Sequence, residues 1–188
     1  MTSLAWTSLS TPVGVVSVGC SQAGVARVRY GHPAVAASAD VGASRSGDER
    51  DAATLFADSA RAELIEYFRG GRQTFDTPVD WSAISGTQRQ VLAVLAETVG
   101  YGRTISYGEL ARRAGLTDDA AKRPAFIPAR AVGTIMASNP IPVIVPCHRV
   151  VASDGLGGYS GGAGTEVKRW LLILEGSQPP TLDWAAAG

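Results

Sequence analysis

The sequence predicts an α+β fold, with a small sheet first along the chain and mostly helices after it. Val, Thr and Gly dominate the first 30 residues, a composition typical of strands and turns. From about residue 55 onward, apolar residues recur at helical spacing instead. Strands and helices segregated in this way are characteristic of α+β architectures. We therefore expect a small N-terminal domain of β-sheet and helix, followed by a helical C-terminal domain with a helix-turn-helix and an active-site loop.

Residues 1–85 are predicted to form the N-terminal domain. Valine-rich stretches up to residue 18 and over residues 25–30 predict two strands joined by a turn. Cys20, at the end of the first strand, is interpreted as a structural or surface thiol. The small, polar and aperiodic residues 31–52 predict a mobile loop. The apolar spacing over residues 55–68 predicts a helix that the following pair of glycines ends.

Residues 86–188 are predicted to form the second, mainly helical domain. One helix is expected before residue 100, a short one after the capping residue Ser106, and another over residues 129–138. The last two are consecutive, which suggests a helix-turn-helix, although residues 117–128 make the connection unusually long. A final helix is expected to reach Glu175 in its last turn.

Composition excludes several classes of protein. The 188 residues carry 17 Lys or Arg and 17 Asp or Glu, so the formal net charge is zero and any contact with nucleic acid must be local. Two Cys and two His are too few for a disulfide framework, and their spacing is not typical of zinc ligands, so no metal is expected. No signal sequence and no apolar run of about 18 residues occur, so we expect a cytoplasmic protein without membrane contact.

A cysteine and a histidine stand side by side at Cys147 and His148. A free thiol with a pKa near ~8.5 is mostly protonated at neutral pH, and a histidine can accept its proton. Neighbouring side chains of an extended strand point to opposite faces, so contact between the two requires a turn at Pro146-Cys147 or a bridging water. Taken alone, the pair is also compatible with a buried structural thiol beside a histidine.

Two features downstream favour chemistry over packing. Glu175 lies where the helix dipole disfavours an anion by about 0.3–1 kcal/mol, so it either orients His148 or is simply solvated at a helix end. Six glycines within residues 155–164 surround Tyr159 and Ser160. Because the helix that follows must pack, this loop is anchored at both ends, and we interpret it as the wall of a pocket.

Together these segments resemble the O6-alkylguanine-DNA alkyltransferases, or methylated-DNA–protein-cysteine methyltransferases. The matching motifs are Pro-Cys-His-Arg-Val at 146–150, Arg-Ala-Val-Gly at 130–133, Asn139-Pro140 and Tyr-Ser-Gly-Gly at 159–162. The first 85 residues resemble the family's less diagnostic first domain. The resemblance implies direct-reversal DNA repair after base flipping, by irreversible single-turnover transfer of a methyl or other alkyl group from O6-alkylguanine in duplex DNA to Cys147. It leaves O4-alkylthymine open as a second substrate.

The resemblance also implies roles for five residues of a catalytic site. Cys147 attacks the alkyl carbon, while His148 relays the thiol proton, through a water, and Glu175 orients His148. Tyr107 aids flipping and protonates the guanine ring. Asn139 braces the turn between the recognition helix and the active-site segment. No cofactor is implied.

For the base pocket and the DNA surface, further residues follow from the resemblance. Val150 offers its carbonyl to the exocyclic amine of the base, and Ser160 and the backbone at Tyr159 bond the O6 side. Arg130 enters the duplex and fills the space that the flipped base leaves. The remaining residues expected at the DNA surface are Ser106, Ala131, Gly133 and Ser153. The expected partner is duplex DNA containing alkylated guanine, bound by a monomer.

Two departures from the family pattern and two other functions stay open. The connection at 117–128 is longer than usual, and Thr87, Leu92 and Ala93 stand near where many members carry phenylalanine or tryptophan. A binding-only alkyltransferase-like protein would lack the reactive cysteine, which is present here. A cysteine hydrolase would need an oxyanion hole, and no motif for one is apparent.

Overall fold

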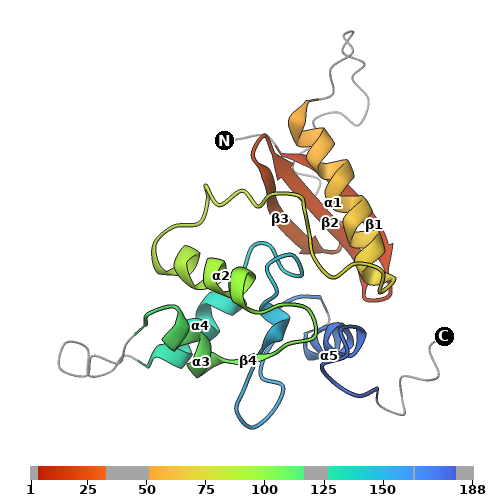
Figure 1. Ribbon diagram of the computed structural model, residues 1–188. Coiled ribbons are helices and arrows are strands. Elements are labelled where there is room, and N and C mark those ends of the chain that lie inside the picture. Colours follow the sequence, from red (N-terminus) through yellow and green to blue (C-terminus); the bar gives the residue numbers. More distant parts are fainter. Residues whose placement is uncertain (1–3, 33–50, 117–126, 163, 181–188) are drawn as a thin grey trace.

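The computed structural model describes residues 4–32, 51–116, 127–162 and 164–180, and their arrangement is α+β (Figure 1). The sheet and one long helix lie together in the upper part of Figure 1, and the remaining helices lie below them. Most of the loop predicted at 31–52 and most of the connection at 117–128 fall outside the described residues.

A three-stranded antiparallel sheet in the order β1-β2-β3 forms the N-terminal part. Its strands are β1 (Ala5–Thr11), β2 (Gly14–Ser21) and β3 (Gly24–Tyr30). The two predicted strands are confirmed as β2 and β3, but the sequence did not predict β1, which pairs with β2 along its whole length. The sequence of β1 is largely polar and only Leu9 is fully buried, so an edge strand of this kind carries little hydrophobic signal.

Helix α1 (Ala52–Phe68) covers the sheet and confirms the predicted helix. Asp51 caps it by accepting a hydrogen bond from the Ala53 amide at 2.8 Å. Alanines along its buried face allow the helix backbone to approach the strands closely.

An extended segment, residues 69–85, leads from α1 back past β3 to the second half of the chain. Pro78 accepts a hydrogen bond from the Val25 amide at 2.8 Å. Glu63 holds the same segment, because its carboxylate accepts from the amides of Asp76 at 3.0 Å and Thr77 at 3.1 Å. This segment is therefore tied to both the sheet and α1.

The second half contains four helices and one short parallel strand pair among its described residues. The helices are α2 (Gly86–Thr98), α3 (Tyr107–Arg113), α4 (Pro128–Ala137) and α5 (Thr165–Leu174). The strand pair, which the sequence did not predict, joins β4 (Ile105–Ser106) to β5 (Val150–Val151). Helices α3 and α4 pack on each other, as a helix-turn-helix requires.

One hydrophobic core runs through both halves of the chain. Val16 of the sheet, Leu64 of α1, Leu95 of α2 and Leu171 of α5 are all fully buried in it. The division into domains at residue 85 therefore stays a prediction. Within the described ranges, no helix is long and apolar enough to cross a membrane.

Candidate active site

A tight turn after α4 delivers Cys147 to the centre of the second half. Asn139 braces this turn, because its side-chain amide donates to Val145 O at 2.9 Å and its oxygen accepts from the Ile141 amide at 3.0 Å. Val143, in the same turn, has a φ of 74°, a left-handed conformation that a β-branched residue rarely adopts. Such strain persists only where the surroundings over-determine it, and Val143 is completely buried.

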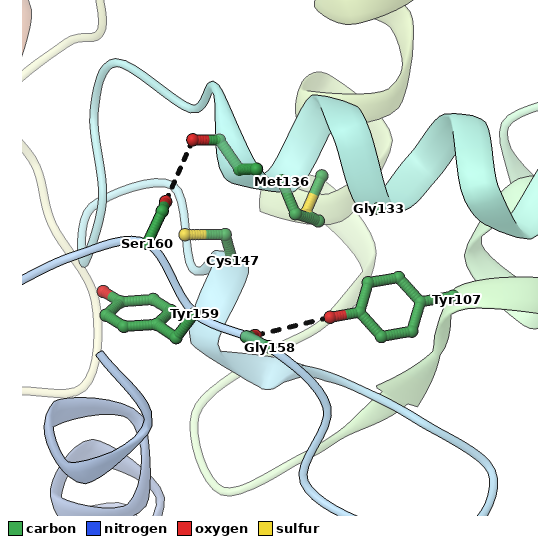
Figure 2. A pocket seen from close by; sticks show the side chains of 8 residues that line it. Tyr107, Gly133, Met136, Cys147, Gly158, Tyr159 and Ser160 are labelled. Atoms are coloured by element: carbon green, nitrogen blue, oxygen red, sulfur yellow. Dashed lines mark hydrogen bonds between the residues drawn. The ribbon is translucent and has the colours of Figure 1, made fainter.

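Cys147 begins a short 3-10 turn, Cys147–Arg149, and its sulfur faces a cavity of about 360 Å³. Figure 2 shows the sulfur between Ser160 and Tyr159, with Met136 of α4 above it and Tyr107 on the opposite side of the cavity. The side chain is only 5 % exposed. A ligand must therefore enter the cavity to reach the sulfur.

Burial makes Cys147 a thiol in the absence of a ligand. It raises the pKa of the thiol, an effect that Asn139, Lys168 and Tyr159 oppose only in part. Burial likewise lowers the pKa of His148, so its imidazole is neutral at pH 7. A neutral imidazole beside a thiol is the protonation state that a general base needs.

His148 and Glu175 form a fully buried pair. Nε2 of His148 lies 2.9 Å from Oε1 of Glu175. Because the carboxylate can only accept, Nε2 carries the proton and Nδ1 is left as an acceptor. Nδ1 is the one buried side-chain nitrogen or oxygen in the described part of the chain that has no hydrogen-bond partner. No hydrogen bond joins it directly to the sulfur, and the predicted relay through a water stays a prediction.

Glu175 is the C-cap of α5 and is held as an anion by several donors. Burial opposes its ionisation, but hydrogen bonds from His148 and Arg149 outweigh this effect and lower its pKa to about 2. Arg149 donates to both of its oxygens at 2.9 Å, and the Tyr67 hydroxyl donates to Oε1 at 2.7 Å. These contacts explain how an anion is stable where the helix dipole disfavours it.

A buried lysine on α5 links two segments of chain beside the pocket. Nζ of Lys168, on α5, donates to Val150 O at 2.6 Å and to Gly158 O at 3.1 Å. Burial lowers its pKa to about 8. The lysine ties the strand after Cys147 to the glycine-rich loop, and it already uses one acceptor position of the Val150 carbonyl, which has two.

Of the predicted base-pocket residues, Tyr159 and Ser160 lie on the glycine-rich loop, whereas Val150 begins β5. The Ser160 hydroxyl donates to Ala137 O at 2.9 Å, so it must turn away from Ala137 to donate to a ligand (Figure 2). The Tyr107 hydroxyl faces Gly158 O at 3.5 Å, a long contact that leaves it available. Burial raises the pKa of Tyr107, so it stays a protonated donor.

Residues predicted at the DNA surface lie at the N-terminus of α3, on α4 and in the turn after β5. Arg130 is exposed in the first turn of α4, and Gly133, one turn further, lines the cavity. Ser106 caps α3 by accepting from the Glu109 amide at 3.1 Å, which confirms the predicted cap. Ala131 is half-buried and Ser153 is exposed.

Comparison with known proteins identifies the family. Residues 86–177 match the model of the 6-O-methylguanine DNA methyltransferase DNA-binding domain. A methylated-DNA–protein-cysteine methyltransferase from Methanopyrus kandleri is 40% identical over 121 residues, which are 64% of this chain and 82% of that protein. This chain belongs to the methylated-DNA–protein-cysteine methyltransferase family.

One further relative matches about half of the chain, and a solved structure matches nearly all of it. The mouse member is 50% identical over 88 residues, which are 47% of this chain and 37% of the mouse protein. A Mycobacterium tuberculosis structure, named OGT and solved in complex with DNA, is 30% identical with a TM-score of 0.68. The match covers 92% of this chain and 93% of that one.

Three residues of this methyltransferase site escaped the sequence analysis. Arg149 stood inside the motif at 146–150 and Lys168 in the final helix, and the burial of either charge could have been suspected only from the apolar residues around it. Tyr67 comes from α1, 108 residues before its partner Glu175. No local pattern marks such a contact. Within the described residues, no cluster of three or more His, Cys, Asp or Glu could hold a metal ion.

Proposed function

We propose that this chain repairs DNA by direct reversal, by moving the alkyl group of an O6-alkylguanine to the sulfur of Cys147. The observation that carries the proposal is the arrangement around Cys147, whose shielded sulfur lines the cavity. The next residue along the chain, His148, is neutral; its Nε2 is held by Glu175, and its Nδ1 has no hydrogen-bond partner and can accept a proton. Membership of the methyltransferase family supports this reaction over others that a thiol and an imidazole could perform.

The step balances without a cofactor. His148 takes the thiol proton, and the sulfur lone pair forms the S–C bond as the C–O6 bond breaks. The electron pair of that bond passes to guanine O6, and the charge is neutralised by a proton delivered to the base. Tyr107 is the donor proposed for this proton. The proton that His148 took from Cys147 then restores the Tyr107 hydroxyl. A thioether remains, and no group in the cavity can cleave it, so each molecule reacts once.

Access to the cavity requires the guanine to leave the DNA stack. Extruding a base costs a few kcal/mol, and a side chain that fills the gap slows its return. Arg130 is proposed for that task, with the exposed faces of α3 and α4 against the duplex. A monomer suffices, because one chain supplies every residue of the reaction. Two free cysteines fit the reducing cytoplasm.

The test is covalent capture. The protein is incubated with duplex DNA that carries one O6-methylguanine and is then examined by intact mass and peptide mapping. The proposal predicts one added methyl group on Cys147 and none in Cys147→Ser, with Cys20→Ser as the matched control that still reacts. Tight binding without an adduct would favour a binding-only damage sensor. Repeated cleavage of an ester would favour a hydrolase.

A further inference from the structure

A second cavity, of about 320 Å³, also reaches Cys147. One of its walls is the end of β3, formed by Val28, Arg29 and Tyr30, and the opposite wall belongs to the glycine-rich loop and the turn after α4. The residues that line both cavities are Met136, Ala137, Cys147, Tyr159 and Ser160. The sulfur therefore lies where the two cavities meet, and the N-terminal sheet contributes to its surroundings.

Tyr30 forms a firm part of this wall. Its hydroxyl lies 2.9 Å from the hydroxyl of Tyr159, and the two rings meet edge to face at 6.4 Å. The Tyr30 ring also presses on the glycine-rich loop, since a Cβ added to Gly161 would lie 2.4 Å from it and one added to Gly162 would lie 3.1 Å from it. Because neighbours hold both the ring and the hydroxyl, the ring has little freedom to move aside.

The geometry of the displacement reaction implies that this wall affects which alkyl groups fit beside the sulfur. Sulfur, the attacked carbon and guanine O6 must lie nearly in line, so the other substituents of that carbon project sideways. In a methyl group they are hydrogens and need little room. In a larger alkyl group they need free space beside the sulfur, and the second cavity provides such space up to the Tyr30 ring.

We propose that Tyr30 is a specificity-determining residue that limits the size of the alkyl group Cys147 accepts, by forming one wall of the second cavity. The inference rests on the proposed function and deepens it, since the bonds formed and broken are the same for every alkyl group. It assigns the substrate range to a residue of the N-terminal sheet, outside the motifs around Cys147.

The experiment compares two substrates in three proteins. Single-turnover transfer from duplex DNA containing O6-methylguanine or O6-benzylguanine is measured for the unsubstituted chain, Tyr30→Ala and Tyr30→Phe. The phenylalanine variant is the matched control, because it keeps the ring and removes only the hydroxyl. We expect Tyr30→Ala to raise the benzyl-to-methyl rate ratio about 10-fold or more, and Tyr30→Phe to leave it within about 2-fold. Tyr30→Leu replaces the alanine variant if that does not fold.

The possible outcomes separate this inference from the proposed function. An unchanged ratio in a folded Tyr30→Ala that still transfers methyl overturns the inference alone. An equal rise in Tyr30→Phe overturns it too, because the hydroxyl contact rather than the ring would then set the limit. Absence of methyl transfer by the unsubstituted chain overturns the proposed function and, with it, this inference.

Discussion

Glu175 is the common hydrogen-bond acceptor of three donors in the site. It accepts hydrogen bonds from His148, Arg149 and Tyr67, and each of these donors is itself buried. The carboxylate therefore has two tasks. It fixes the tautomer of His148, and it compensates the charge of the largely buried Arg149 guanidinium.

Replacing Glu175 by glutamine tests the second task. We expect the free energy of unfolding at pH 7 to fall by about 3 kcal/mol, because Arg149 would become an uncompensated buried charge. Urea unfolding measures the change. Glu166→Gln is the matched control on the same helix, since Glu166 is exposed and its ion-pair partner Arg169 lies 3.6 Å away. Equal effects of the two substitutions would contradict this account.

The stabilisation by Glu175 also has a defined pH dependence. Its pKa in the folded chain is about 2, below the ordinary value of 4.5 that applies to the unfolded chain. The contribution is therefore complete above about pH 4.5 and is lost as the pH falls toward 2. The stability difference between the unsubstituted chain and Glu175→Gln should narrow over this range. A difference that is constant from pH 5 to the acid limit of folding would contradict it.

At the scale of elements, the turn between β2 and β3 depends on one glycine. Gly24 has a φ of 132°, and a Cβ there would lie 2.0 Å from the carbonyl oxygen of Pro78. We expect Gly24→Ala to lower the free energy of unfolding by about 3 kcal/mol or more, through backbone strain and the loss of the contact with residues 78–80. Gly31→Ala is the control, because φ is also positive there but the space is open, and about 1 kcal/mol is expected. Chemical denaturation distinguishes the two, and similar losses would refute the clash.

Helix α4 carries the predicted interaction with the duplex. Arg130→Ala should slow methyl transfer from duplex DNA about 10-fold or more, because the flipped base would return more readily. It should leave the reaction of Cys147 with free O6-benzylguanine unchanged, since no flipping is needed there. Arg27→Ala, an exposed arginine on β3, is the control for loss of one positive charge. A parallel loss on both substrates would place Arg130 in the chemistry instead.

Elements with a strong hydrophobic period were predictable from the sequence, and weak ones were not. Helix α1 buries mainly apolar residues at helical spacing, with Glu63 among them, and the cap of α3 follows from Ser106. Strand β1 is an edge strand with one fully buried residue, and β4 and β5 have two residues each. Such short or polar segments become strands because they pair with other strands, and the sequence of the segment alone does not reveal that partner.

At the scale of the whole molecule, the N-terminal half takes part in the site. Tyr67 of α1 donates to Glu175, and Tyr30 of β3 contacts Tyr159. The family resemblance drew attention to Cys147, His148 and Glu175 in the second half, although it assigned no role to Arg149 or Lys168. The contribution of the first half depends on tertiary packing over more than 100 residues of chain, so only the structure reveals it.

A double-mutant cycle measures the link between the halves. The effects of Tyr67→Phe and Glu175→Gln on the free energy of unfolding should be non-additive by at least about 0.5 kcal/mol, since both remove the same buried hydrogen bond. Ser8→Ala is the control partner, because the Ser8 hydroxyl bonds Ser17 within the sheet. Its effect should add to that of Glu175→Gln. Additivity in the first cycle would mean that the contact carries no coupling.

The central claim is that Cys147 accepts one alkyl group and is then spent. The most direct test is a count of lesions removed per protein molecule, with duplex DNA containing O6-methylguanine in large molar excess. The account predicts a plateau at one lesion for each active molecule, and no removal by Cys147→Ser. Continued removal beyond one lesion per molecule would contradict it.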